Sequence, residues 1–227
     1  MTRVLVEDDS QLARAPVNNL QARRYEVDVA PGSAAALRLA AARQPDVVLL
    51  DPGLPAMEGV DVIKALRGWS RAPIVVLSPR GGSEDKIRAL DAGADDDVTK
   101  PFSTDELPAR LRAATRRVEA APEPAYEAAV VTTDEFTVDL VAKKVRRGGR
   151  DVRLTPTEWH LLEILLCNPG RLISQRRLLE EVWGHSAGNR TNYLRVYMAQ
   201  LRRKIEADPS HPRHLVTEPG MGYRFEA

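Results

Sequence analysis

The sequence predicts an α/β chain of two domains: a five-stranded, doubly wound parallel sheet, followed by an α+β unit of three helices and a closing hairpin. Over residues 1–117, short apolar runs alternate five times with amphipathic stretches. Residues 118–131 contain two prolines and no clear periodicity, which is typical of a linker. Residues 1–117 carry 17 Lys+Arg and 17 Asp+Glu, whereas residues 132–227 carry 16 and 12, so the second half is basic. We therefore expect domains at 1–117 and 132–227 with different partners.

The first domain is expected to be a parallel sheet of flavodoxin type. Three of its apolar runs are continuous, as in strands that are buried on both faces. The ligands of such sheets bind beyond the carboxyl ends of the strands. The expected strands are 4–6, 27–29, 47–50, 74–77 and 98–99, and the expected helices lie near 10–22, 34–43, 58–67, 83–91 and 104–117.

The second domain has the pattern of a winged helix. A Gly148-Gly149 turn joins two apparent hairpin strands, and helices are expected near 156–167, 174–183 and 190–206. Thr155, Pro156 and Glu158 form the signature of a helix start with a capping box. A second hairpin turns at 219–222, so three helices end in a wing.

Composition excludes several classes of protein. No apolar run approaches the roughly 18 residues that span a bilayer, and the acidic N-terminus is not that of a signal peptide. Cys167 is the only cysteine, so an internal disulfide is excluded, and the four histidines show no zinc-ligand spacing. We expect a cytoplasmic protein with no membrane partner.

Polar or charged side chains follow four of the predicted strands. Glu7 and Asp8 come after the first strand, Asp51 after the third, Ser78 after the fourth and Lys100 after the fifth. Because parallel strands end at one edge, these side chains converge there, and the carboxylates need a cation to offset their repulsion. Oxygen ligands favour Mg²⁺.

This pocket predicts phosphoryl transfer to a carboxylate. Asp51 is the candidate nucleophile and would form an acyl phosphate, while Mg²⁺ and Lys100 neutralise the charge on the transferred group. Asp8 and Asp51 are expected to ligate the metal directly, and Glu7 through water.

The helix expected at 190–206 has one apolar stripe, formed by Leu194, Met198, Leu201 and Ile205. Basic and amide side chains interleave with that stripe, which is typical of a helix that enters the major groove of DNA. These side chains are Asn192, Arg195, Gln200, Arg202 and Arg203.

The first 117 residues resemble a receiver domain, and the whole chain is similar to response regulators of the OmpR/PhoB family. The resemblance is carried by residues 4–9, 45–51, 53–55, 92–96 and 99–102. It implies a transcription regulator rather than an enzyme. A sensor histidine kinase would phosphorylate Asp51, the backbone carbonyl of Gly53 would complete the Mg²⁺ site, and Ser78 would hydrogen-bond the phosphoryl oxygen.

The resemblance also implies partners for each domain. The activated chain would form a homodimer through ion pairs, and it would bind double-stranded promoter DNA, also contacting RNA polymerase through the segment 185–189. Residues 192–204 and 208–214 most resemble a regulator of a potassium-transport operon. The implied dimer pairs are Lys86 with Glu106, Asp96 with Arg110, and Asp91 with Arg112, and the implied DNA contacts are Asn192, Tyr197, Gln200, Arg202 and, from the wing, Arg224.

Several positions depart from the family pattern. Asp97 stands where an aromatic residue is usual, Pro52 and Pro79 follow the nucleophile and the switch hydroxyl, and Ala56 replaces a common acid. Pro16 and Pro108 fall inside expected helices. These departures keep open a constitutive DNA-binding protein with a degenerate receiver. An Asp-nucleophile phosphohydrolase is a second alternative, although Gly53 stands where such enzymes usually carry an acid.

Overall fold

The computed structural model describes residues 1–7, 14–51, 59–79, 83–119, 130–184 and 191–227. The chain divides into two compact units, Met1–Ala120 and Ala121–Ala227. None of the helices within those ranges is long and apolar enough to cross a membrane.

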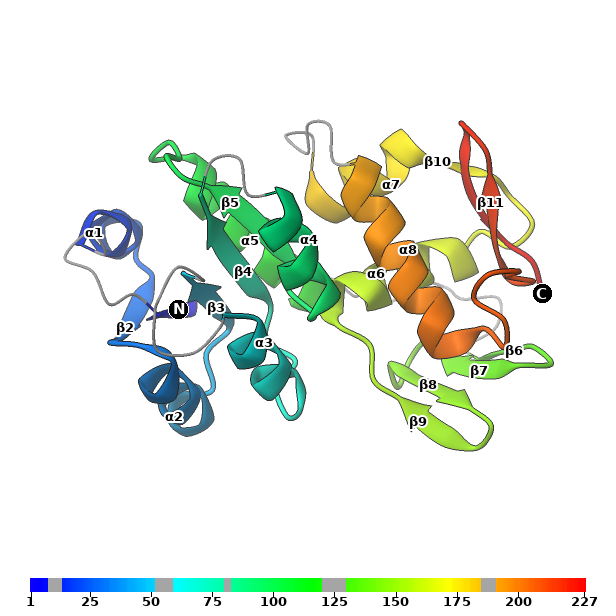
Figure 1. The fold of residues 1–227 in the computed structure, drawn as a ribbon, viewed down its shortest axis with the longest axis horizontal. Coiled ribbons are helices and arrows are strands. Elements are labelled where there is room, and N and C mark those ends of the chain that lie inside the picture. Colours follow the sequence, from blue (N-terminus) through cyan, green and yellow to red (C-terminus); the bar gives the residue numbers. More distant parts are fainter. Residues whose placement is uncertain (8–13, 52–58, 80–82, 120–129, 185–190) are drawn as a thin grey trace. The chain divides into compact units, whose positions relative to one another are not determined.

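The first unit is a parallel sheet with helices on both faces (Figure 1). Its strands run in the order β2-β1-β3-β4-β5, so the direction of strand addition reverses between β1 and β3. The parallel fold expected from the alternating pattern is confirmed. The elements are β1 (Arg3–Glu7), α1 (Arg14–Ala22), β2 (Glu26–Ala30), α2 (Ser33–Arg43), β3 (Val47–Leu50), α3 (Gly59–Arg67), β4 (Ile74–Ser78), α4 (Ser83–Asp91), β5 (Asp96–Thr99) and α5 (Glu106–Glu119).

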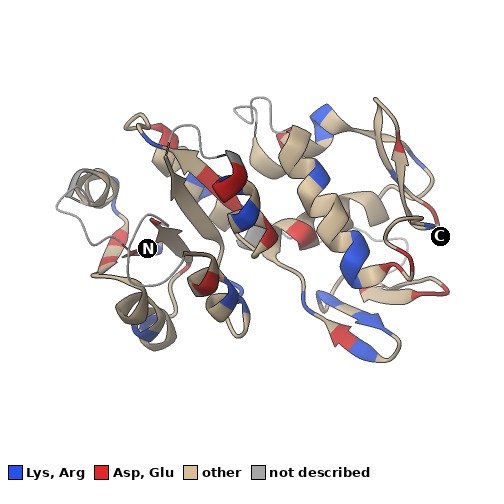
Figure 2. Ribbon diagram, in the orientation of Figure 1, with Lys and Arg blue, Asp and Glu red and all other residues tan. Residues whose placement is uncertain are grey.

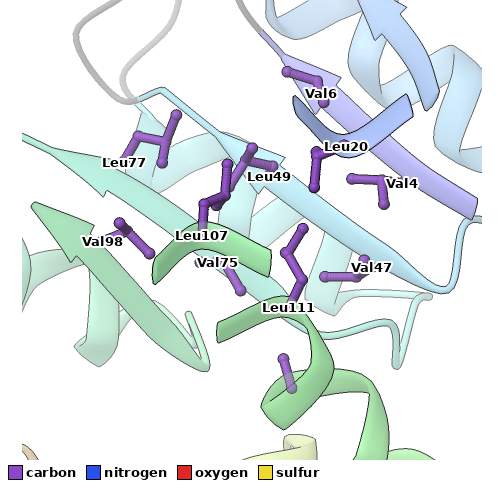
Figure 3. Close-up of a cluster of buried hydrophobic side chains, with 11 residues drawn as sticks. Val4, Val6, Leu20, Val47, Leu49, Val75, Leu77, Val98, Leu107 and Leu111 are labelled. Atoms are coloured by element: carbon purple, nitrogen blue, oxygen red, sulfur yellow. The ribbon is translucent and has the colours of Figure 1, made fainter. Parts of the chain in front are cut away.

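One face of this sheet packs its valine and leucine side chains against α1 and α5 (Figure 3). Leu20 of α1 and Leu107 and Leu111 of α5 are almost completely buried there. Burial of a side chain of this size stabilises the fold by about 1.5–3 kcal/mol. The strand residues in the cluster are Val4, Val6, Val47, Leu49, Val75, Leu77 and Val98.

The two helical prolines lie where a helix tolerates them. Pro16 is the third residue of α1 and Pro108 the third of α5. The N–H groups of a first helical turn have no partner within the helix, so proline removes no intrahelical hydrogen bond there.

The second unit combines two small antiparallel sheets with three helices (Figure 1). Val130 and Val131, which the sequence analysis assigned to the linker, belong to the first strand, while residues 120–129 of that linker lie outside the described ranges. The strand orders are β6-β7-β8-β9 and β10-β12-β11. The elements are β6 (Val130–Thr132), β7 (Phe136–Asp139), β8 (Lys144–Arg147), β9 (Arg150–Val152), α6 (Pro156–Leu166), β10 (Ile173–Ser174), α7 (Gln175–Trp183), α8 (Thr191–Ile205), β11 (Leu215–Glu218) and β12 (Gly222–Phe225).

Local sequence signals in this unit form as expected. Thr155 and Glu158 make both hydrogen bonds of the capping box, with Pro156 at the helix start. Gly148 and Gly149 both have positive φ, 53° and 76°, which suits the tight turn between β8 and β9. Gly222 admits no side chain, because a Cβ there would lie 2.0 Å from the carbonyl oxygen of Ile173. The wing sheet therefore depends on this glycine.

A buried carboxylate holds the end of α8 against β11. Glu206 is fully buried, and its side chain accepts the backbone N–H groups of Arg213 at 2.9 Å, His214 at 3.2 Å and Leu215 at 2.6 Å. A charged acceptor strengthens such bonds, and its loss leaves buried donors without a partner.

Glu206→Ala is therefore expected to lower the free energy of unfolding of the second unit by about 3 kcal/mol. Urea denaturation followed by tryptophan fluorescence measures this, because Trp159 and Trp183 both belong to that unit. The control is Glu181→Ala, which removes an exposed partner of Arg177 and should change stability by about 0.5 kcal/mol or less. Equal unfolding midpoints for the two variants would contradict the assigned role of Glu206.

Candidate functional site

Asp51 lies at the end of β3, beside the point where the order of strand addition reverses. It directly follows β3, and the Lys100 ammonium, which follows β5, donates to its Oδ2 atom. The Asp51 side chain is 14% exposed and that of Lys100 39% exposed, so the pair can be reached from solvent. The carboxylate thus combines the access that a nucleophile needs with a cation that can neutralise incoming charge.

Glu7 is the second carboxylate at this edge. It ends β1, and it stands opposite Leu50, the residue before Asp51, in the register of β1 and β3. Its side chain is 1% exposed. Two carboxylates at adjacent strand ends supply the oxygen ligands that Mg²⁺ prefers, so this donor set fits the expected cation. The other expected ligands, Asp8 and Gly53, lie outside the described residues.

Ser78 contacts a carboxylate of the neighbouring strand, a pairing that its sequence position does not indicate. It ends β4, is 1% exposed, and its hydroxyl donates to Oδ2 of Asp97 at 2.9 Å. The Lys86 ammonium of α4 lies 3.4 Å from the same oxygen and donates to Thr99 Oγ1 at 2.7 Å. The residue noted as a departure from the family therefore connects the switch hydroxyl to α4.

Two of the expected ion pairs involve residues that also have partners within their own chain. Lys86 points toward Asp97 and Thr99, and its expected pairing with Glu106 of a second copy stays a prediction. Asp96 and Arg110 do approach each other, at 3.9 Å, but within one chain and with side chains only 0% and 10% exposed.

The third expected pair remains at the surface. Asp91 and Arg112 are both exposed, and Glu106 is partly exposed. Pro79 is also exposed, directly after Ser78, while Pro52 and Ala56 lie outside the described residues.

The apolar stripe of α8 is buried as expected, but two of the expected DNA contacts share that burial. Tyr197 is 0% exposed and packs against the Trp183 ring of α7, with ring centroids 5.5 Å apart. Gln200 is 5% exposed. Both side chains are thus withdrawn from solvent, and the expected DNA contacts of Tyr197 and Gln200 stay predictions.

Arg202 of α8 contacts the wing. Its Nε donates to the Leu215 carbonyl at 2.9 Å, its Nη2 donates to Thr217 Oγ1 at 2.6 Å, and its guanidinium lies 5.9 Å from the Tyr223 ring centroid. Burial lowers the pKa of Arg202 and raises the pKa of Tyr223, as expected for groups withdrawn from water. Arg202 braces α8 against β11, and its assignment as a base contact stays a prediction.

Arg224 is likewise paired within the wing. Its guanidinium donates to Glu218, and its Nη1 lies 3.4 Å from Oε1 of Glu226. The expected reach into a minor groove would require breaking these pairs.

Three of the expected contacts stay on the exposed side of α8. Asn192, Arg195 and Arg203 are exposed, and with Ala199 they form a stripe spaced by three or four residues. Figure 2 shows Lys and Arg along α8. We call these four residues the α8 stripe. The segment 185–189, expected to contact RNA polymerase, lies outside the described residues.

Within the described ranges, one group of side chains has the spacing of a metal site. Ligand atoms of Asp134, Glu135 and His214 lie within 4.8 Å of one another. The Arg213 guanidinium already donates to Asp134 at 2.6 Å, and this hydrogen bond is the largest cause of the lowered pKa of that carboxyl. The Arg213 guanidinium therefore already balances the Asp134 carboxylate, and we assign a structural role to these side chains beside β7.

Comparison with known proteins agrees with both halves of the structure. Residues 4–112 match the family described as response regulator receiver domain, and residues 149–225 match the family described as transcriptional regulatory protein, C terminal. The chain is 60% identical to the transcriptional regulatory protein KdpE of Mycobacterium tuberculosis, with 100% of each covered. It is 47% identical to the KDP operon transcriptional regulatory protein KdpE of Escherichia coli, with 99% of each covered.

Solved structures share the fold. A mutant of RitR superposes with a TM-score of 0.78 at 24% identity, with 99% of each chain covered. The response regulator DrrB, an OmpR/PhoB homologue from Thermotoga maritima, gives a TM-score of 0.50 at 25% identity, with 100% of each chain covered.

Proposed function

The chain belongs to the response regulators that join a receiver domain to a C-terminal DNA-binding domain, and from that premise we propose that phosphorylation of Asp51 controls how the second domain binds promoter DNA. The observation that supports this most strongly is the Asp51–Lys100 pair at the β1/β3 edge. A partly exposed carboxylate with a cation on one oxygen is suited to receive a phosphoryl group.

In the proposed reaction, a sensor histidine kinase presents a phosphohistidine. An Asp51 oxygen attacks the phosphorus, the new O–P bond forms as the N–P bond breaks, and the imidazole leaves and takes up a proton from solvent. Lys100 offsets charge on the transferring oxygens. A bound Mg²⁺ would add charge neutralisation, and Asp8, Asp51, the Gly53 carbonyl and, through water, Glu7 would hold it.

For the second domain we propose that the α8 stripe enters the major groove. Arg195 and Arg203 carry the charge that binds phosphates or guanine edges, and Asn192 can bond to adenine. Phosphorylated chains would pair through the surface that carries Asp91 and Arg112. RNA polymerase would then meet the bound regulator through the segment 185–189, and these events take place in the cytoplasm, where the promoter lies.

The proposed target is a potassium-transport operon. The relatives support this, since one at 47% identity is named for the KDP operon and another at 60% identity carries the same protein name. A phosphorylation-independent regulator is not favoured, because Asp51 and Lys100 are present and paired. A phosphohydrolase is not favoured either, because these relatives are transcription regulators.

Asp51→Asn tests the phosphoacceptor. Incubation with acetyl phosphate and Mg²⁺, followed by intact mass spectrometry, should show one added phosphate on the unaltered chain and none on the variant, because an amide oxygen is a far weaker nucleophile than a carboxylate. Asp85→Asn, which changes an exposed acid on α4, is the control and should take up phosphate normally. Equal phosphate uptake by Asp51→Asn would refute the assignment.

Arg195→Ala tests the α8 stripe. Fluorescence anisotropy with a duplex from the promoter region of the chain's own gene should show weaker binding, with the slope of log affinity against log salt reduced by about 1 for one lost phosphate contact. Arg38→Ala, which removes an exposed charge from α2 of the other unit, controls for net charge. If Arg195→Ala and Arg38→Ala bind DNA with the same affinity and the same salt slope, the proposal that the α8 stripe enters the major groove is contradicted.

A further inference from the structure

We propose that Asp97 is the positioning residue that couples Ser78 to α4. Its buried carboxylate holds the Ser78 hydroxyl and the Lys86 ammonium at rest, and Ser78 leaves it when Asp51 carries a phosphoryl group. This inference rests on the proposed function of Asp51.

The register of the sheet brings the three groups to one face. Ser78 of β4 stands opposite Thr99 of β5, and Asp97 lies two residues before Thr99, so these side chains point the same way. Lys86 reaches that face from α4, with Nζ 3.4 Å from Asp97 and 2.7 Å from Thr99 Oγ1.

The neighbouring acid points to the opposite face. Asp96 lies toward α5, where Arg110 is 3.9 Å away. Consecutive acids on β5 thus connect the strand to α4 on one side and to α5 on the other. Asp96 provides a matched control for Asp97, because it is an equally buried acid in the same strand.

Burial strengthens the interaction between Asp97 and Lys86. Its side chain is 3% exposed and that of Lys86 is 18% exposed, so the pair is less screened by water than an ordinary surface pair. A buried carboxylate is costly unless donors surround it, so removing one donor shifts the balance of the whole group.

The Ser78 hydroxyl can serve only one acceptor at a time. A serine hydroxyl carries a single proton, which is donated to Asp97 at 2.9 Å in this structure. If that proton is donated to a phosphoryl oxygen, Asp97 loses the hydrogen bond from Ser78. The Asp97 carboxylate is then no longer held in place by Ser78, and its contact with the Lys86 ammonium weakens. The choice of acceptor therefore sets the position of Lys86, and with it the surface of α4.

The reactivity of Lys86 toward an amine-acetylating reagent, read by peptide mass spectrometry on the full-length chain, tests this coupling. Lys64, which is 63% exposed on α3, serves as the internal standard. In the unaltered chain Lys86 should react more slowly than Lys64, and phosphorylation by acetyl phosphate and Mg²⁺ should raise its rate by about fivefold.

Asp97→Asn should raise the rate of Lys86 by a similar factor without phosphate, because the amide cannot balance the ammonium, while phosphate uptake continues. Asp96→Asn should leave Lys86 protected. Ser78→Ala should accept phosphate, but phosphorylation should not raise the Lys86 reactivity of this variant. If circular dichroism shows that Asp97→Asn is unfolded, the result for Ser78→Ala alone tests the coupling.

Unchanged Lys86 reactivity in folded Asp97→Asn, or a phosphate-induced rise that persists in Ser78→Ala, overturns the coupling alone. Failure of the unaltered chain to take up phosphate overturns the proposed function and the coupling with it.

Discussion

The balance of charge at the carboxyl edge of the parallel sheet is the constraint on which the rest of the structure depends. The strand order β2-β1-β3-β4-β5 places Glu7 and Asp51 at the ends of adjacent strands, and Lys100 reaches Asp51 from the end of β5. Carboxylates that share one edge of a sheet repel one another unless cations offset them. The apolar core beneath α1 and α5 provides the rigid support that keeps these groups at one edge.

Charge also connects this edge to the helices around it. Ser78 ends β4 and donates to Asp97 of β5. The Lys86 ammonium of α4 lies 3.4 Å from the same carboxylate and donates to Thr99 of that strand. A hydrogen bond with a single proton can respond to a new anion in an all-or-none manner. The sheet edge and the α4 surface are thus joined through polar contacts, where the family pattern has an aromatic ring.

Much of this arrangement could be predicted from local sequence. Apolar periodicity located the strands and helices, and the capping box at Thr155 formed as expected. Local sequence does not reveal the surroundings of side chains that pack against distant elements. Tyr197 is covered by Trp183 of α7, and Arg202 is bound by Leu215 of β11, neither of which a helical pattern can reveal. The inward contacts of Lys86 likewise depend on Asp97 and Thr99 of β5, which lie far from it in the sequence.

The most direct test of the central claim is the affinity of the full-length chain for Mg²⁺, measured by isothermal titration calorimetry, in unaltered protein and in Glu7→Gln. If the two carboxylates are held together by a cation, the variant should bind Mg²⁺ about 10–100-fold more weakly, as is typical when an outer-shell ligand is lost. Equal affinity in the two proteins would contradict the account, because Glu7 would then have no part in holding charge at this edge.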